Sequence, residues 1–281
     1  MKKAKIYTSD SSLVDPLNAV REMLTDLWAA KELAWRLFVR DISAQCRTSF
    51  LGLLWKFVPP IITAIGFTLA KETKIFNVGL TEIPYPAYVM LSMVLWQTFQ
   101  EAMQAPLKAL QNSKSLLGRI NFPREALVLA KVWEVVFNFG VKMAPILGIF
   151  VYFNLTVSSA VLLAPLGVLS LLVLGLCFGI FLAPLSLISD DIGRTVNAVQ
   201  SFWIFLTPIV YPLPHGGLFA TVVRLNPVTP LLVTTRELTT GSSISDSAGF
   251  IVVSVSATLG LCLSWLVFRL SMPRVIERLG T

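Results

Sequence analysis

Charged residues and histidine are scarce in this chain of 281 residues. Aspartate, glutamate, lysine and arginine make up 14% of it, and His215 is the single histidine. Histidine-based metal clusters and Ser–His triads are therefore largely excluded. The sequence GxxxxGK[ST] is missing as well, so the chain cannot bind ATP through a P-loop of its own. Cys46, Cys177 and Cys262 are widely separated and predict packing residues, not a disulfide set or a metal site. We expect no cofactor and no metal in this chain, and no catalysis by it.

Long apolar stretches dominate what is present. Hydrophobic residues make up 55% of the chain, and its mean hydropathy is +0.73. A helix needs roughly 20 apolar residues to cross about 30 Å of hydrocarbon. The fold class is therefore predicted as an all-α integral membrane protein with one six-span membrane domain over 51–281. The predicted spans lie near 51–70, 86–104, 127–153, 160–188, 195–211 and 248–269.

The basic residues are distributed unevenly between the connections. With residues 1–50 placed as a cytoplasmic N-terminal segment, the cytoplasmic side holds sixteen lysines and arginines, and the opposite side holds four. Cytoplasmic connections carry the excess of lysine and arginine in membrane proteins. Both termini are therefore predicted to be cytoplasmic. The net charge of +7 is expected to set topology, and no nucleic-acid partner is expected.

Residues 17–46 have a helical pattern but do not span. Their large apolar side chains fall within about 100° of one another at 100° per residue. Such a helix can lie in the headgroup layer with tryptophans at the interface. Packing against a soluble partner is the open alternative. The apolar residues are Val20, Leu24, Leu27, Trp28, Trp35, Phe38 and Ile42.

Residues 105–125 form a basic connection between the second and third predicted spans. Lys108, Lys114, Arg119 and Arg124 lie in it, and Glu125 is its one acid. Leucines at helical spacing predict a short cytoplasmic helix. Phe122 then interrupts it, because a residue before a proline is disfavoured in helical geometry, and Pro123 suits the first turn of the next helix. A short helix held between two spans could transmit a movement of a bound partner to those spans. The same residues also suit an ordinary basic loop.

The segment after the fifth predicted span, 212–241, is moderately apolar but rich in proline and glycine. It is too broken to span and too apolar for an ordinary exposed loop. Two short re-entrant helices on the periplasmic side, roughly 216–225 and 228–240, fit it best. Non-helical backbone at membrane depth must be covered by protein or by a water-filled cavity. The prolines and glycines are Pro212, Pro214, Gly216, Gly217, Pro227 and Pro230.

Polar residues share one face of the third predicted span. Lys131, Glu134, Asn138 and Lys142 are spaced three, four and four apart. Ionisable groups inside a membrane are costly and usually face a bundle interior or an aqueous cavity. We expect this face to line a pathway or to hold its walls by ion pairing. A structural ion pair, or a lysine that reaches the nearer interface, is the alternative.

Two further spans carry milder polar faces. Asn197, Gln200, Thr207 and Tyr211 lie on one face of the fifth span, and Gln97, Glu101 and Gln104 lie on the second. A polar lumen needs such groups beside aromatic rings that stack on sugars. Polar faces can also hydrogen-bond to one another, and tryptophans can anchor at an interface. The candidate rings are Trp55, Trp96, Trp133 and Trp203.

Four motifs, in order along six predicted spans, resemble those of a known family. Arg47-Thr48-Ser49-Phe50-Leu51-Gly52-Leu53-Leu54-Trp55 follows the N-terminal helix, and Asn121-Phe122-Pro123-Arg124-Glu125 follows the second span. Thr207-Pro208-Ile209-Val210-Tyr211-Pro212 ends the fifth span. Asn226-Pro227-Val228-Thr229-Pro230 comes next, followed by Arg236. The chain thereby resembles the membrane subunits of bacterial ABC transporters that export polysaccharides, polyol phosphates and O-antigens.

The resemblance implies a homodimer in the bacterial inner membrane, bound to two copies of an ATPase chain that holds ATP and magnesium. The cargo would be a polysaccharide on undecaprenyl pyrophosphate. Residues 105–125 would couple to the ATPase through Lys114, Arg119, Phe122 and Arg124. The periplasmic gate would contain Pro212, Pro214, Asn226, Pro227 and Pro230. The expected pathway residues are Trp55, Trp96, Glu134, Asn138, Lys142, Asn197, Gln200, Trp203, Thr207 and Tyr211.

Two other functions fit parts of the pattern. A drug or peptide exporter of the same superfamily would use the same ATPase partner. A membrane enzyme acting on polyprenyl phosphate would depend on Asp190 and Asp191, two adjacent acids at the inner end of the fourth span. Two acids beside Arg194 are more often an ordinary loop terminus.

Overall fold

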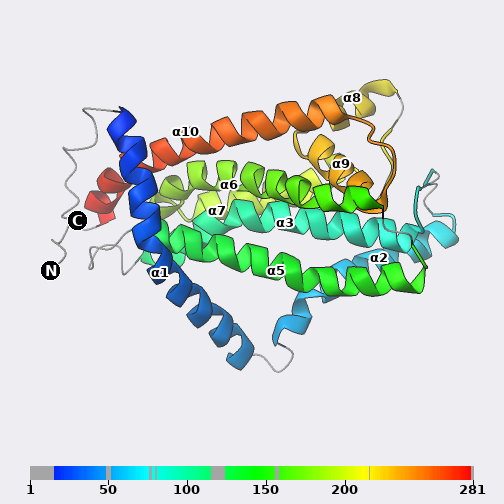
Figure 1. The fold of residues 1–281 in the computed structure, drawn as a ribbon, viewed down its shortest axis with the longest axis horizontal. Helices are drawn as coiled ribbons and strands as arrows, with labels where there is room; N and C mark the ends of the chain where they lie inside the picture. Colours follow the sequence, from blue (N-terminus) through cyan, green and yellow to red (C-terminus); the bar gives the residue numbers. More distant parts are fainter. Residues whose placement is uncertain are drawn as a thin grey trace.

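A computed structural model of the chain describes residues 16–48, 52–75, 78–79, 81–114, 124–155, 158–214 and 216–279. Within these ranges the regular elements are all helical (Figure 1). They are α1 (Pro16–Thr48), η1 (Gly52–Lys56), α2 (Val58–Glu72), α3 (Tyr85–Asn112), α5 (Glu125–Tyr152), η2 (Ser159–Leu163), α6 (Ala164–Ile188), α7 (Asp191–Trp203), η3 (Ile204–Leu206), α8 (Gly217–Leu225), α9 (Val228–Thr240) and α10 (Ser247–Leu279).

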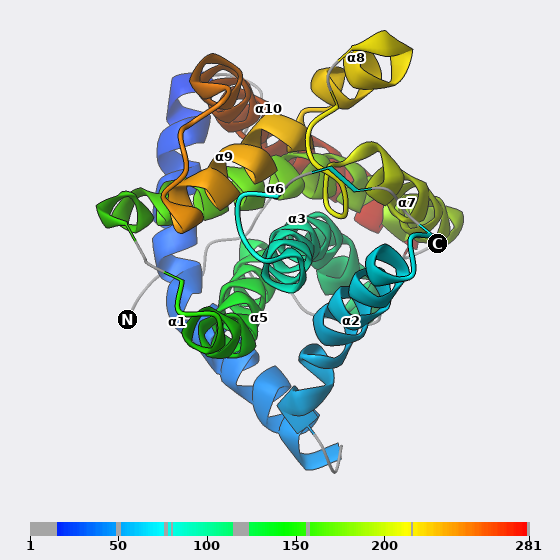
Figure 2. The same cartoon turned by 90° about the vertical axis from the view of Figure 1, so that its right-hand side faces the viewer.

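Helix α3 lies in the middle of the bundle. Seen from the end that carries α8 and α9, it is surrounded by α2, α5 and α6, whereas α10 lies outside α6 (Figure 2). Its side chains are buried on almost every side, and Trp96 and Phe99 are fully enclosed. Helices α2, α5 and α6 therefore pack around α3 as their common core, while α1 packs on α5 and α10 packs on α6.

Two glycines allow α6 to approach α3 closely. Gly175 and Gly179 are four residues apart on α6, in the small-xxx-small arrangement that brings membrane helices together. A Cβ atom on Gly175 would lie 2.6 Å from the carbonyl oxygen of Phe99. A Cβ atom on Gly179 would collide with the carbonyl of Met103. Larger residues at these two positions would have to separate the helices.

Among the residues that the structure describes, four helical segments are long and apolar enough to cross a membrane, or five if α8 and α9 count as one bent span. The four are Gly52–Glu72, Glu125–Tyr152, Ser159–Ile188 and Ser247–Glu277. They match the first, third, fourth and sixth predicted spans. The second predicted span lies within α3, whose 28 residues are long enough but polar in part.

The fifth predicted span differs from the structure at its outer end. Helix α7 ends at Trp203, one 3₁₀ turn follows, and Thr207 is already extended with ψ 132°. The expected helix over 195–211 is therefore wrong beyond residue 206. Pro208 explains the break, because it disfavours helical geometry at the preceding residue and has no amide hydrogen to donate.

Helix α1 matches the helix predicted over 17–46 and crosses the bundle steeply at the end opposite α8 and α9 (Figure 1). It packs on α5 through Ala30, Leu33, Ala34 and Leu37. Trp28 points away from this contact and is 77% exposed. The helix therefore packs on α5 through small residues and through the rings of Trp35 and Phe38, which contact Trp133, while Trp28 stays exposed.

The broken segment near the fifth span forms helices where the sequence predicted them. α8 and α9 meet at Asn226 and Pro227 with an 84° bend. The connection between α3 and α5 is described only at its ends. Lys114 is exposed there, and Arg124 is the N-cap residue of α5. Arg119 and Phe122 lie outside the described residues.

Candidate functional site

A network that we call the polar ladder joins α1, η1, α3 and α5. At its lower end, Lys131 on α5 forms ion pairs with Asp41 on α1 (2.9 Å) and Glu134 on α5 (2.7 Å). Gln45 on α1 donates a 2.5 Å hydrogen bond to the carboxylate of Glu134. Helix α1 is therefore tied to α5 by polar bonds as well as by its alanine face. The ladder comprises Asp41, Gln45, Lys56, Glu101, Lys131, Glu134, Asn138 and Lys142.

The upper half of the ladder reaches the central helix. Lys56 of η1 donates to Gln45 (3.2 Å) and to the Asn138 side-chain oxygen. The Asn138 amide in turn donates to Glu101 on α3 at 3.1 Å, and Lys142 forms an ion pair with Glu101. The Lys142 side chain is only 3% exposed, whereas that of Glu101 is 31% exposed. A continuous chain of polar contacts thus runs from α1 to the interior of the bundle.

The charges within the ladder balance. It contains three lysines and three carboxylates, and each lysine contacts a carboxylate or an amide oxygen. Burying an ion is expensive unless an opposite charge and hydrogen bonds compensate it. The structural ion pair considered for Lys142 from the sequence is therefore present in this chain. Its partner is Glu101 on another helix, not Glu134 on its own.

The pKa of Asp41 is shifted in the direction expected for a carboxyl group paired with Lys131. Burial alone would raise the pKa of this carboxyl group. Hydrogen bonds from Lys131 and Arg40, together with their positive charges, outweigh burial and hold the pKa of Asp41 below its usual value. The carboxylate is therefore ionised at neutral pH and holds α1 against α5 in that form.

A second polar cluster lies on a different part of α3. Gln104 donates to Asn197 at 2.7 Å and to Gln200 at 2.6 Å, both on α7. Gln200 is buried, and Asn197 is exposed. The structure thus brings Gln104 of the second predicted span together with Asn197 and Gln200 of the fifth, whereas Glu101 of the second span joins the ladder. Within the chain these three amides are hydrogen-bonded, which was the alternative to lining a lumen.

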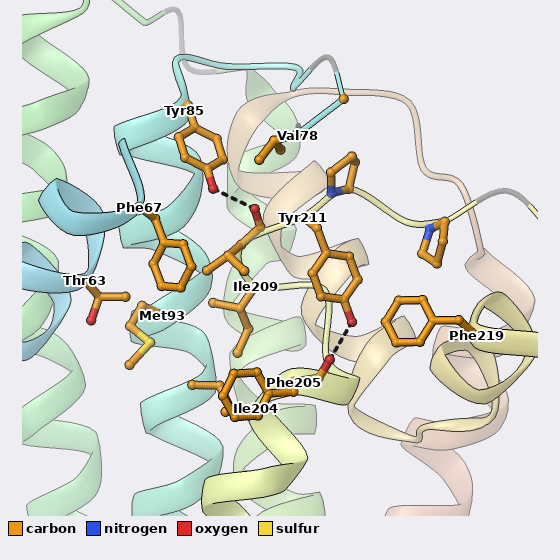
Figure 3. Close-up of a pocket in the computed structure, with 14 residues that line it drawn as sticks. Thr63, Phe67, Val78, Tyr85, Met93, Ile204, Phe205, Ile209, Tyr211 and Phe219 are labelled. Atoms are coloured by element: carbon orange, nitrogen blue, oxygen red, sulfur yellow. Dashed lines mark hydrogen bonds between the residues drawn. The ribbon is translucent and has the colours of Figure 1, made fainter. Parts of the chain in front are cut away.

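The segment from the last residue of η3 to Pro212, which we call the strap (residues 206–212), is held through its carbonyl groups. Tyr85 and Tyr88 on α3 donate to the carbonyl oxygens of Val210 (2.8 Å) and Tyr211 (2.9 Å) (Figure 3 shows the first). Buried backbone polar groups need partners, and an irregular segment cannot supply its own. Two more side chains serve the strap: Asn226 donates to Leu206 O (3.1 Å), and Arg236 donates to Pro208 O (3.1 Å).

Asn226 is the centre of a compact hydrogen-bonded unit. Its side-chain oxygen accepts bonds from the Trp203 indole (2.9 Å) and the backbone amide of Val228 (3.1 Å). Its amide group donates to the Thr207 hydroxyl at 2.9 Å as well as to Leu206. The sequence assigned Trp203 and Thr207 to the pathway and Asn226 to the gate. The structure joins them, so α7 and the α8–α9 turn form one unit.

Arg236 was part of a motif but was not expected as a site residue. It is 5% exposed and lies with its guanidinium 4.0 Å from the centre of the Tyr88 ring. One nitrogen donates to Ser92 on α3 at 3.0 Å as well as to the strap. Its Nε has no hydrogen-bond partner among the described residues. These hydrogen bonds and the ring contact of this cation are thus with neutral groups, and the charges of Glu82 and Glu237 act on it as well.

The other predicted residues fall into different environments. Trp55 is 57% exposed on η1, whereas Trp96 is enclosed beside Phe99 and Trp203. Tyr211 bonds to the Phe205 carbonyl at 2.9 Å and, with Pro212 and Pro214, borders a cavity (Figure 3). Pro227 is the N-cap residue of α9, and Pro230 is buried within its first turn.

The two adjacent acids Asp190 and Asp191 lie at the start of α7. Asp191 is exposed in the first turn of α7 and lies 3.5 Å from Arg194, as at an ordinary helix start. No group of three histidine, cysteine, aspartate or glutamate residues is arranged for a metal ion in the part of the chain that the structure describes.

Comparison with known proteins identifies similar membrane subunits. The family described as ABC-2 type transporter matches residues 32–239. An O-antigen export system permease protein RfbA of Myxococcus xanthus is 24% identical over 221 residues, which cover 77% of this chain and 83% of that protein. A protein of the same name from Klebsiella pneumoniae is 23% identical over 208 residues, which cover 71% and 76% of the two chains.

Proposed function

The chain belongs to the ABC-2 type transporter family, and from this we propose that it is the membrane subunit of an ATP-driven exporter of polysaccharide. The match over residues 32–239 carries the proposal, because it extends from α1 through the strap and most of α9. The resemblance inferred from the motifs agrees with it. Both relatives are named O-antigen export system permeases, which supports a glycan as the substrate class.

We further propose six membrane spans in a chain that is already shown to be a multi-pass membrane protein. Helix α3 would be the second span, with its polar groups hidden among its neighbours. Helix α7 and η3 would form a short fifth span that ends at the strap. Helices α8 and α9 would enter the outer leaflet from the periplasm and return. The bonds from Asn226 and Arg236 to the strap support this, since irregular backbone at membrane depth must be covered.

The proposed assembly is a homodimer in the bacterial inner membrane with two copies of a separate ATPase, which would hold ATP and magnesium. Both termini would be cytoplasmic, with residues 1–50 ahead of a single membrane domain over 51–281. Residues 105–125 would contact the ATPase. The pathway would run between the two copies, with the gate at 212–241 on the outside. The cargo would be a glycan linked to undecaprenyl pyrophosphate.

Purification from the native membrane tests the assembly. An affinity-tagged chain, extracted in mild detergent, should carry an ATPase subunit with it at equal stoichiometry, at the mass of a two-plus-two complex. Arg124→Glu should weaken that association because it reverses a charge in the proposed contact, whereas Arg224→Glu on α8 serves as the matched control. A tagged chain that is well folded and yet free of any ATPase would contradict the proposal.

A further inference from the structure

The strap lies between a set of hydrogen-bond donors and a cavity. From one side, Tyr85, Tyr88 and Arg236 donate to three of its carbonyl oxygens, at 2.8, 2.9 and 3.1 Å. An apolar cavity of about 680 Å³ separates the strap from α2 and α8 (Figure 3). Tyr88 and Arg236 do not border this cavity. These two donors and the cavity therefore lie on different sides of the strap.

The cavity leaves room beside the strap. Packed protein interiors contain few voids larger than a water molecule, and a void removes dispersion contacts from the atoms that line it. Ile209 and Val210 of the strap border this one, together with Phe67 on α2 and Phe219 on α8. Movement of the strap toward α2 or α8 would close the void and would not first have to displace packed side chains.

The bonds within the strap and at its first end do not involve α3. The Tyr211 hydroxyl donates back to the Phe205 carbonyl at 2.9 Å, which closes the segment on itself. Asn226 holds the first end by donating to the Leu206 carbonyl at 3.1 Å. Both bonds can persist while the rest of the strap leaves α3. The strap can therefore move as one unit with Asn226 as its pivot.

The donors on the other side keep their positions without the strap. The rings of Tyr85 and Tyr88 stack with their centroids 6.3 Å apart. The Lys71 ammonium lies 4.5 Å from the centre of the first ring, and the Arg236 guanidinium lies 4.0 Å from the centre of the second and donates to Ser92 at 3.0 Å. Ring stacking and cation–ring contacts are favourable in themselves. A fixed row of donors thus remains for the strap to return to.

We propose that the strap is a movable part of the outer gate, latched against α3 by the hydroxyl groups of Tyr85 and Tyr88 and against α9 by Arg236. When the latch opens, the strap swings about Asn226 into the cavity and exposes Ser92 behind it. The inference rests on the proposed function, in which the gate begins where the strap ends. A hydrogen bond that water can replace contributes little net stability, so a latch of three such bonds can open and close.

The reactivity of a buried cysteine tests the latch. Ser92 is fully buried, and the nitrogen of Arg236 that donates to it also donates to Pro208 of the strap. Ser92→Cys is made with the three native cysteines replaced by alanine, and the purified protein in nanodiscs is treated with a water-soluble methanethiosulfonate. Mass spectrometry follows the labelling over time. Thr235→Cys is the matched control, because Thr235 is equally buried on α9 but packs against Gly167 of α6.

Loss of the two tyrosine hydroxyl groups should open the latch. Tyr85→Phe/Tyr88→Phe removes two hydrogen bonds and keeps both rings, so labelling at position 92 should be about tenfold faster. Met93 borders the cavity from α3, and the addition of Met93→Trp should fill the cavity and return the rate to that of the parent. Labelling at position 235 should be equally slow in all three proteins. The measurement uses neither glycan nor ATPase, so its failure is distinguishable from a failure of the proposed export.

Three results would overturn the proposal. Unchanged labelling at position 92 without the hydroxyl groups would mean that these groups do not hold the strap. Faster labelling at position 235 as well would mean that the hydroxyl groups stabilise the whole outer end of the bundle. Labelling that stays fast after Met93→Trp would mean that the strap does not enter the cavity. If Met93→Trp fails to fold, Phe219→Trp fills the cavity from α8 and gives the same comparison.

Discussion

Lys142 on α5 is paired with Glu101 on α3, although the two residues are 41 positions apart in the sequence. The lysine is almost fully buried, and Asn138 also donates a hydrogen bond to the carboxylate at 3.1 Å. This ion pair links α3 to α5, the helix on which α1 packs. The pairing also changes what a lysine substitution should do, because its loss leaves an acid unpaired.

Replacement of Lys142 by methionine should therefore destabilise the protein, by less than the roughly 3–5 kcal/mol of a fully buried pair, because the Glu101 side chain is 31% exposed and partly solvated. The double variant Lys142→Met/Glu101→Gln should recover most of the loss, since the glutamine can still bind Asn138. Thermal unfolding in detergent and the amount of monodisperse protein measure both effects. If the single variant is as stable as the parent, the pair is not structural. Export per folded subunit in the double variant then tests a pathway role separately.

The close approach of α6 to α3 predicts that alanine at Gly179 lowers stability much more than alanine at Gly140. Gly179→Ala should destabilise the protein by about 1–3 kcal/mol, because the added methyl group would overlap the backbone of α3. Gly140→Ala is the matched control, since a Cβ atom there meets nothing within 4 Å. Melting temperatures of the purified variants give the comparison. Equal stability of the two variants would contradict the packing of α6 on α3.

The hydrogen bonds of Asn226 predict that Asn226→Ala loosens the strap. Several buried groups would lose a partner, and one unsatisfied group costs about 1–3 kcal/mol. Hydrogen exchange followed by mass spectrometry should show faster exchange at Val228 and in the peptide that contains Thr207. Asn197→Ala removes a single bond at an exposed position and should leave the strap protected. The idea fails if both variants exchange alike.

The lowered pKa of Asp41 predicts a pH dependence for the contact between α1 and α5. A carboxyl group whose pKa is depressed by folding stabilises the protein above its usual pKa of 3.8. That contribution is lost as the pH falls through the lower folded value. The difference in melting temperature between the parent and Asp41→Asn should thus be constant near neutral pH and shrink below about pH 4. A difference that grows on acidification would reverse the assigned sign.

Local patterns in the sequence predicted the helices and one side of the site. The spacing of Lys131, Glu134, Asn138 and Lys142 placed them on one face, and they do form one side of the ladder. The prolines and glycines after the fifth span predicted α8 and α9 because each breaks a helix in a known way. Such signals act over a few residues and need no knowledge of the fold.

The partners of these residues could not be predicted in the same way. Lys56 and Glu101 reach the α5 face from distant helices, and nothing near either residue in the sequence indicates the contact. The strap is similar, because Tyr85 and Tyr88 bind carbonyls more than 120 positions away. The fifth span was extended too far because its composition stays apolar past Pro208. Which polar groups contact one another depends on how the helices pack, and local sequence patterns do not contain that information.

The fate of the glycan in living cells tests the proposed export most directly. The gene is deleted in its native host, and polysaccharide is measured on the cell surface and in the cytoplasmic fraction. The account predicts that surface polysaccharide is lost while polymer accumulates inside on its lipid carrier, and that the intact gene restores export only when its ATPase is present. Normal surface polysaccharide in the deletion strain, with altered resistance to drugs or peptides instead, would contradict it and favour a different cargo.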